Sequence, residues 1–467
     1  MPPLISIPRR LIGTLLLVVL AAAAAFLAAD ARRPGAAAPS SPTPLVAEGE
    51  LLVRYRPGMP SYVRRLMTTV GALSESSIDE LWILRLRLRP GLSVAEAQAM
   101  YGAMPGVEFA EPNYVYNAAD SPNDPLYASQ SWYYALVEAP EAWELETGDA
   151  SVIVAVLDSG VDVSHPDLGD KVWRNEAETA GDGVDDDGNG CIDDVNGCNF
   201  VTPASVDATC GPPPLVLTGQ VADDAGHGTF VAGIIGAATD NGEGVASVAR
   251  GVRLMPVKIL DCTGSGTAAD AAQGLLYALR MGAQVVNLSF GGEEDSITFR
   301  EAIRLAREQF GAVMVAASGN EGEEGVTYPA RYPQVIAVGA TARNSPDELA
   351  PFSNWGPEVD VAAPGVDLVS TVPAPLCGSR WACVGGQPYA RASGTSFAAA
   401  QVAALAALLI SHSPTMSNEE VLSVVRATAQ PLPDGATPGW AGAGRVRMGR
   451  ALSAAVFHLG GPGAARN

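Results

Sequence analysis

The sequence predicts an α/β domain with a mainly parallel sheet, preceded by a smaller α+β unit. From residue 151 onward, short continuous apolar runs recur, which is typical of strands buried on both faces of a parallel sheet. Helical stretches alternate with these runs, as expected for strand–helix–strand units. In the smaller unit, apolar and polar residues alternate over 82–88, which indicates a strand with one buried face.

Five apolar runs are predicted to be the strands of the larger domain: 152–157, 254–260, 285–288, 312–317 and 335–338. The predicted helices are 229–237, 267–281, 297–309, 396–411 and 418–427. A capping box, Ser417-x-x-Glu420, precedes the last of these helices. In such domains functional groups gather beyond the carboxyl ends of the strands, so we expect the site there.

The smaller unit is predicted to span residues 48–117. It combines strands near 51–55 and 82–88 with a helix near 94–100 and a final extended segment. This pattern is compatible with a ferredoxin-like α+β arrangement. The preceding residues, 32–47, are rich in Ala and Pro and poor in large apolar residues, so we interpret them as a linker.

The first residues resemble an export signal. Arg9 and Arg10 precede an apolar run over 11–29, and Ala29-Asp30-Ala31 fits a cleavage site. We therefore expect a signal peptide over 1–31. The run also approaches the length of a bilayer span, so an uncleaved membrane anchor is the alternative.

The net charge and the cysteine content indicate which partners and which cellular compartment to expect. The formal net charge of -22 argues against a nucleic-acid partner, because a phosphate backbone attracts Lys and Arg. The six cysteines form an even set, as expected for disulfides formed after export. Six cysteines allow 15 connectivities, and the short Cys377–Cys383 loop is the one pairing that we predict.

Three motifs place chemically useful groups where strands end or helices begin. Asp158 ends the first apolar run, and His227 lies between two glycines at the start of a helix. Ser396 begins an apolar helix, where free N–H groups can stabilise negative charge on a nearby oxygen. Each residue alone has a structural explanation, as a turn former, a buried polar group or a helix cap. Together, a carboxylate, an imidazole and a hydroxyl can activate a serine nucleophile.

Asp158-Ser159-Gly160, His227-Gly228-Thr229 and Gly394-Thr395-Ser396 resemble the motifs of the subtilisin-like serine proteases, the subtilases. Their order differs from that of chymotrypsin-like enzymes and α/β-hydrolases. The resemblance implies a subtilisin-like three-layer peptidase domain over residues 123–454, with a tail over 455–467.

The resemblance also implies a role for each residue. Ser396 is expected to be the nucleophile, His227 its general base and Asp158 the group that orients the base. Residues 316–322 resemble the oxyanion-hole segment of the family, so Asn320 and the Ser396 backbone N–H are the expected donors. The expected activity is hydrolysis of peptide bonds in polypeptides through an acyl-enzyme, without a catalytic cofactor.

Substrate-binding residues are assigned by the same resemblance. Ser289-Phe290-Gly291 resembles the edge segment that pairs with an extended peptide, and Ser318-Gly319 resembles one wall of the pocket for the residue before the cut. Thr327 stands where many relatives have Gly, so we expect a narrow pocket that disfavours large aromatic side chains. Ala400 and Gln401 replace the usual Pro and His of the family, which bears on helix packing.

An acidic loop over 182–194 predicts a structural calcium site. Its carboxylates alternate in the manner of a calcium loop, and charges so dense repel one another unless a cation lies among them. Some subtilases carry a similar insert. The expected ligands are Asp185, Asp187, Asn189, Cys191, Asp193 and Asp194, the last two as alternatives. A solvated acidic turn without an ion is the competing interpretation.

The unit over 48–117 resembles the inhibitory pro-segment of the family. We therefore expect a self-processing zymogen that is cut between about residues 115 and 120 and acts as a monomer. It would be secreted, or anchored to a membrane if the leader stays uncleaved. A catalytically silent binding protein with the same fold and a calcium-dependent adhesive module are the competing functions.

Overall fold

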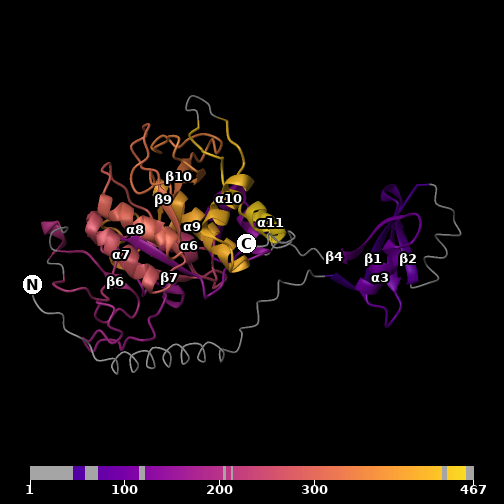
Figure 1. Cartoon of the computed structure of the whole chain (residues 1–467), viewed down its shortest axis with the longest axis horizontal. Coiled ribbons are helices and arrows are strands. Elements are labelled where there is room, and N and C mark those ends of the chain that lie inside the picture. Colours follow the sequence, from indigo (N-terminus) through magenta and orange to yellow (C-terminus); the bar gives the residue numbers. More distant parts are fainter. Residues whose placement is uncertain are drawn as a thin grey trace, which may run out of the picture. The chain divides into compact units, whose positions relative to one another are not determined.

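The computed structural model describes residues 46–57, 72–114, 121–202, 207–211, 214–433 and 439–458. The predicted leader, almost all of the predicted linker and the predicted processing site at 115–120 lie outside the described residues. The chain divides into two compact units, residues 1–117 and 118–467, which are described separately (Figure 1).

The smaller unit is a four-stranded antiparallel sheet with one described helix packed on it (Figure 1). The strand order is β2-β3-β1-β4. The elements are β1 (Val46–Tyr55), β2 (Ala72–Ile78), η1 (Asp79–Leu81), β3 (Ile83–Leu88), α3 (Val94–Gly102) and β4 (Val107–Tyr114). Alternation along β3 buries Leu84 and Leu86 in one cluster with Ala97 and Tyr101 of α3, and it exposes Arg85. A ferredoxin-like arrangement stays a prediction, because residues 58–71 lie outside the described part.

The larger unit is built on a seven-stranded sheet in the order β11-β10-β9-β8-β5-β7-β6. Neighbouring strands pair in parallel. The strands are β5 (Ile153–Asp158), β6 (Cys198–Asn199), β7 (Arg253–Lys258), β8 (Val285–Leu288), β9 (Val313–Ala317), β10 (Ile336–Thr341) and β11 (Val361–Pro364). A separate antiparallel pair is formed by β12 (Leu368–Thr371) and β13 (Tyr389–Ala392). The five predicted runs correspond to β5 and β7 to β10, whereas β6 and β11 span only 2 and 4 residues and left no apolar run of their own.

Helices cover both faces of this sheet (Figure 1). They are α4 (Tyr127–Leu136), α5 (Ala139–Trp143), α6 (His227–Gly236), α7 (Ala268–Arg280), α8 (Ile297–Glu308), α9 (Thr395–His412), α10 (Asn418–Thr428) and α11 (Met448–His458). Short 3-10 turns are η2 (Gly169–Lys171), η3 (Ala208–Cys210), η4 (Ala374–Leu376) and η5 (Val384–Gly386). Successive strand side chains point to opposite faces, so Val154 and Val156 pack in one cluster with α6 and α9, while Ala155 and Leu157 pack in the other with α7 and α8. The predicted three-layer fold is confirmed.

Helix α9 forms the centre of one of these layers. In the described part of the chain it alone is long and apolar enough to cross a membrane, but 94% of that stretch is buried inside the domain. Its apolar composition is therefore explained by core packing. Ala400 is fully buried, and Gln401 donates from Nε2 to the carbonyls of Pro364 and Phe397, at 2.6 and 3.1 Å. At these two departures from the family pattern the helix remains packed and bonded to β11.

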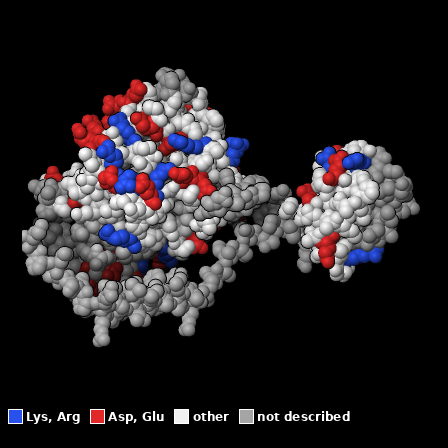
Figure 2. All heavy atoms as spheres, viewed as in Figure 1, with Lys and Arg blue, Asp and Glu red and all other residues white. Residues whose placement is uncertain are grey.

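On the face drawn in Figure 2, Lys and Arg side chains of the larger unit lie interspersed with Asp and Glu. This pattern suits a solvated surface. The expectation that the chain takes no nucleic-acid partner stays a prediction.

Candidate active site

The candidate catalytic residues lie at one edge of the parallel sheet. Strand β5 ends at Asp158, β8 is followed by Ser289, and β9 is followed by Ser318-Gly319-Asn320. Strands β7 and β8 lie on opposite sides of β5, so the strand order along the chain switches from one side of β5 to the other. A crevice opens beyond the strand ends at such a point. His227 is the first residue of α6 and Ser396 the second residue of α9.

Asp158 and His227 form a hydrogen-bonded pair. Nδ1 of His227 lies 2.8 and 3.0 Å from the two carboxylate oxygens of Asp158, which is fully buried. With Nδ1 as the donor, Nε2 of the neutral ring carries the lone pair. Burial of the ring opposes its charged form, but the charge and hydrogen bond of Asp158, helped by Asp223, outweigh burial and raise the pKa of His227 above its usual value.

A second buried carboxylate, Asp223, holds this pair in place, and the sequence did not reveal it. One oxygen of Asp223 accepts from the Ser159 hydroxyl at 2.8 Å and from the N–H groups of Ala225 and Gly226. The other oxygen accepts from the N–H and hydroxyl of Thr229, in the first turn of α6. Asp223 thus links the residue after Asp158 to the loop and helix that carry His227. An Asp placed three residues before a turn glycine was the one signal in the sequence.

Ser396 and Asn320 lie with His227 in one cleft of about 660 Å³. Oδ1 of Asn320 accepts from the Thr395 N–H at 2.9 Å and from its hydroxyl at 3.0 Å, so the amide nitrogen is left as a free donor group. The Ser396 hydroxyl donates to the Ser289 carbonyl at 3.1 Å. The hydrogen bonds among the described residues include none between this hydroxyl and Nε2 of His227, and such bonds often tighten only when substrate is bound.

Family comparison decides what kind of protein carries this cleft. Residues 149–444, more than half of the chain, match the model of the subtilase family. The chain belongs to the subtilase family. It is accordingly a serine-type endopeptidase. Residues 32–113 match the fervidolysin N-terminal prodomain. This match supports a zymogen, and it includes the whole segment over 32–47 that was predicted to be a linker.

Individual relatives agree with this assignment. A thermophilic serine proteinase from Bacillus sp. (strain AK1) is 35% identical over 386 residues, which cover 82% of this chain and 83% of the relative. Thermitase from Thermoactinomyces vulgaris is 35% identical over 71% of this chain and 99% of its own length. A solved protease structure from Pseudoalteromonas arctica PAMC 21717 superposes with a TM-score of 0.59 at 29% identity, over 72% of this chain and all of the other.

The predicted substrate residues of this subtilase lie along the same cleft and beside it. Phe290 and Gly291 line the cleft, whereas the Ser289 side chain is turned inward and donates to the Ser396 carbonyl at 2.9 Å. Thr327 directly faces Gly291, because a Cβ placed on Gly291 would lie 2.3 Å from the Thr327 hydroxyl oxygen. That hydroxyl also donates to the Ser318 carbonyl at 3.3 Å. The Thr327 side chain thus occupies the space between two of the predicted substrate-binding segments.

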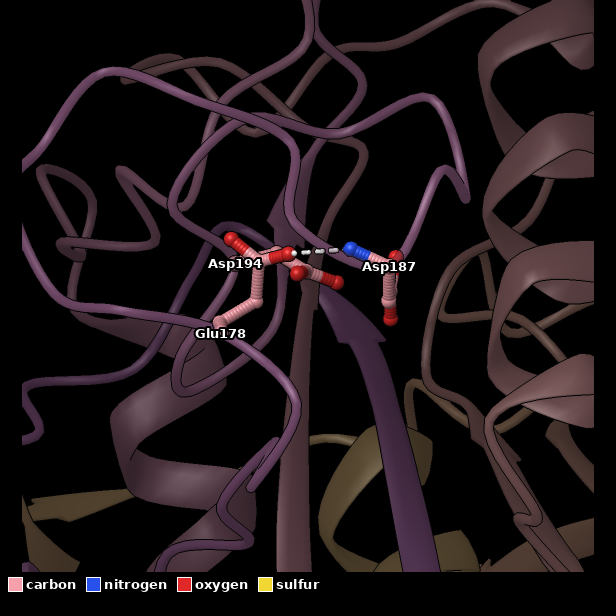
Figure 3. Close-up of side chains that lie close together, drawn as sticks. All are labelled: Glu178, Asp187 and Asp194. Carbon is pink, nitrogen blue, oxygen red and sulfur yellow. Dashed lines mark hydrogen bonds between the residues drawn. The ribbon is translucent and has the colours of Figure 1, made fainter.

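The acidic loop brings together only part of the predicted calcium set. Carboxylate oxygens of Asp187, Asp194 and Glu178 lie within 4.8 Å of one another (Figure 3). Asp185 and Asp193 instead accept hydrogen bonds from backbone N–H groups of the loop. Asn189 turns its amide nitrogen toward Asp187 and Asp194, and the sulfur of Cys191 is bonded to Cys198. In the structure, therefore, the cluster contains Asp187 and Asp194 of the predicted ligands.

Glu178 is the member of this cluster that the sequence did not indicate. It lies outside the acidic run and only 6% of it is exposed. Its Oε1 accepts from the N–H groups of Asp186 and Asp187, while its Oε2 is buried without a hydrogen-bond partner. Burial, together with the charges of Asp194 and Asp187, raises the pKa of Glu178. An unpartnered buried oxygen among carboxylates fits a hard cation such as Ca²⁺, which binds oxygen ligands.

All six cysteines are paired. The predicted Cys377–Cys383 disulfide is confirmed, and the other pairs are Cys191–Cys198 and Cys210–Cys262. Cys262 lines the catalytic cleft, and Cys191–Cys198 closes the end of the acidic loop. Cys377–Cys383 closes a loop that also reaches the cleft, so all three disulfides secure segments around the candidate sites.

Proposed function

We propose that this subtilase hydrolyses polypeptides through an acyl-enzyme, with Ser396, His227 and Asp158 as its catalytic triad. The observation that carries the proposal is the buried Asp158 carboxylate 2.8 Å from Nδ1 of His227, in a cleft shared with Ser396. That hydrogen bond selects the tautomer in which Nε2 can accept a proton. In the reacting enzyme the Ser396 hydroxyl is proposed to leave the Ser289 carbonyl and donate to Nε2 of His227.

In the first half of the reaction, Oγ of Ser396 forms a bond to the scissile carbonyl carbon while Nε2 of His227 takes its proton. The carbonyl π electrons move to oxygen, and this oxyanion accepts hydrogen bonds from Nδ2 of Asn320 and the Ser396 N–H. Collapse breaks the C–N bond, and His227 gives the proton to the departing amine. Water then repeats the sequence in place of the serine and releases the acid product.

The triad is tested by labelling the purified enzyme with a fluorophosphonate. We expect labelling of the wild type and loss of labelling in Ser396→Ala, because the reagent needs an activated serine. Ser289→Ala is a weaker variant that leaves the nucleophile in place, so it should still be labelled. Absence of labelling in a folded, processed wild type would favour the silent binding protein or the adhesive module instead.

We further propose that Thr327 limits the size of the substrate residue before the cut. The contact with Gly291 and the hydrogen bond to Ser318 support this, since both tie the branched side chain across the expected pocket. Cleavage of a peptide library should favour small and medium side chains at this position. Thr327→Gly should increase cleavage after Phe about tenfold, the lower end of the effect expected from one methylene group of pocket space. A wild-type preference for Phe or Tyr would contradict the proposal.

The acidic cluster is proposed to hold a structural calcium ion. Glu178, Asp187 and Asp194 would supply carboxylate oxygens, and the ion would neutralise their charge without entering the reaction. The support is the unpartnered Oε2 of Glu178, together with the absence of a cationic side chain among the hydrogen-bond donors to these three carboxylates in the described part of the chain. Of the ligands predicted from the sequence, Asp187 and Asp194 are kept in this proposed set, and Glu178 is added.

Export and self-processing complete the proposed function. The prodomain match over 32–113 supports an inhibitory pro-segment, and three disulfides support folding in an oxidising compartment. If processing is autocatalytic, purified Ser396→Ala should keep its pro-segment while the wild type loses it near residues 115–120. Equal trimming of both would assign the cut to another protease. N-terminal sequencing of secreted protein distinguishes a cleaved leader from an anchor.

A further inference from the structure

The loop over 372–388 joins β12 to β13 and reaches the catalytic cleft. The Cys377–Cys383 disulfide closes the middle of this loop around Arg380 and Trp381. The Trp381 ring stacks on Phe230 of α6, with ring centroids 5.5 Å apart, and its Nε1 donates to the Ala225 carbonyl at 2.9 Å. The loop is therefore fastened to the segment that carries His227, and its conformation is defined before substrate arrives.

Arg380 extends from this fastened loop to two neighbouring segments, which carry Asp224 and Cys262. Its guanidinium donates to the backbone carbonyls of Asp224, at 3.1 Å, and Cys262. Both acceptors are neutral, so the positive charge is held in place but not cancelled. The nearby Asp224 carboxylate is already paired, at 2.7 Å, with Lys258. Arg380 is itself exposed, so part of the guanidinium faces the cleft and solvent.

The charge of Arg380 is not balanced by other groups of the cleft. Among the described residues that line it, only His227 and Arg380 have ionisable side chains, because Cys262 is in a disulfide. The walls are otherwise formed by small polar residues, glycine, Leu260 and Phe290. A fixed cation on an otherwise uncharged wall attracts an anionic side chain and repels a cationic one.

The alternation of an extended peptide indicates which substrate residue meets this charge. Our proposed function places the side chain before the cut at Thr327 and Ser318, and the backbone along Ser289-Phe290-Gly291. Successive side chains of an extended chain point to opposite sides. The side chain one residue earlier, the second before the cut, is then directed toward the wall of Ala225, Leu260 and Arg380.

We propose that Arg380 selects Asp or Glu at the second substrate residue before the cut. The inference rests on the proposed function of the cleft, and it adds the charge preference of one subsite. The anchoring of the guanidinium by two carbonyls means that little side-chain freedom is lost when a substrate carboxylate binds.

The test uses processed enzyme and quenched peptides that differ only at this position, with Glu, Ala or Lys. We expect kcat/KM for Glu to exceed that for Ala about fivefold, and Lys to be disfavoured by a similar factor, the size of one exposed ion pair. Arg380→Gln keeps a hydrogen-bond donor for the two carbonyls but removes the charge, so it should reduce the Glu-to-Lys ratio to near one while cleavage of the Ala peptide is retained. Arg300→Ala, which removes a half-buried arginine of α8 that is paired with Asp295, is the matched control and should keep the ratio.

Raising the salt concentration should lower the Glu-to-Lys ratio in the wild type and leave it unchanged in Arg380→Gln, because exposed charges are screened. A labelled, active wild type with equal rates for the Glu and Lys peptides would overturn the inference and leave the triad standing. A preference for Asp or Glu at this position that survives in Arg380→Gln would overturn it as well. So would a preference for Asp or Glu that is found only at substrate residues after the cut. Failure of the wild type both to label and to cleave the Ala peptide would overturn the proposed function itself, and this inference with it.

Discussion

The catalytic cleft and the acidic loop both bury carboxylates, but they compensate the charge differently. In the cleft, Asp158 is matched by an imidazole that can become positive and by the N–H of Ser159 at 2.7 Å. In the loop, the partners of Asp194 are the neutral side chains of Asn175, Asn189 and Tyr277, and one oxygen of Glu178 has none. Buried charge without a counter-charge is costly. The cleft is therefore complete as protein, whereas the loop is expected to need a cation.

Replacing His227, which balances the charge of Asp158, should lower kcat more than any other substitution considered. His227→Ala deprives Ser396 of its base, and we expect kcat to fall about 10⁶-fold, the size measured for the same group in a subtilisin. Single-turnover cleavage of a chromogenic peptide measures this. His412→Ala, at the far end of α9, is the matched control and should retain activity. A loss of less than about tenfold in His227→Ala would remove this residue from the chemistry.

The cleft also compensates a charge that exists only during the reaction. Asn320→Ala removes one donor to the oxyanion, so kcat should fall about 10²- to 10³-fold, again the size known from a subtilisin. KM should change little, because the ground-state carbonyl carries less charge. Comparison of kcat with KM over a substrate series measures the split, with Asn344→Ala, an exposed asparagine, as the control. A rise in KM with kcat unchanged and folding intact would instead assign Asn320 to substrate binding.

The contribution of the acidic loop to the free energy of unfolding should depend on calcium and not on substitutions in the cleft. In a Ser396→Ala background, which prevents self-digestion, chelation should lower the free energy of unfolding by about 2.7 kcal/mol if calcium is present at about 100 times its Kd. Thermal unfolding with and without chelator measures this. Glu178→Gln should reduce the calcium response strongly, whereas Asp193→Asn should keep it, since Asp193 caps backbone N–H groups and asparagine tolerates its left-handed φ of 54°. Identical unfolding curves for the Ser396→Ala protein with and without chelator would favour a solvated turn.

The pH dependence of activity should show the effect of Asp158 on the pKa of His227. Only neutral imidazole can take the serine proton, so kcat/KM is lost as the pH falls through the pKa of His227. Because Asp158 raises that pKa above 6.5, the acid limb should have its midpoint above this value. Asp158→Asn removes the charge and should move the midpoint of the residual activity down. A wild-type profile that is flat between about pH 5 and 8 would contradict the assigned base.

Most of the fold and the central site residues could be predicted from the sequence, because their signals are local. The apolar runs that became β5 and β7 to β10 are buried on both faces, so no exposed polar residue interrupts them. Asp158, His227 and Ser396 are found by their flanking glycines and small residues, which the sharp strand-to-loop and loop-to-helix transitions require. The short Cys377–Cys383 loop was predictable for the same reason.

The contacts that the sequence missed join segments whose proximity depends on the packed domain. Nothing adjacent to Glu178 marks it as a member of the acidic cluster, and only the folded loop places its carboxylate beside Asp194. The Cys210–Cys262 pair spans 52 positions, and many alternative pairings had equal local support. Asp223 accepts a hydrogen bond from the hydroxyl of Ser159, 64 positions earlier, and Arg380 donates to the distant carbonyls of Asp224 and Cys262. The residues next to Asp223 and Arg380 in the sequence do not indicate these partners.

Apolar periodicity along the chain was enough to predict the layers of the domain. The resemblance of three short motifs, in their order, was enough to indicate the family and the three candidate catalytic groups. The packed structure was needed to show which buried carboxylates have a counter-charge, that Arg380 is the cation lining the cleft, and that Thr327 lies against Gly291. The physical reason is that charge compensation and steric fit depend on distances through space, and these exist only once the strands and loops have been packed together.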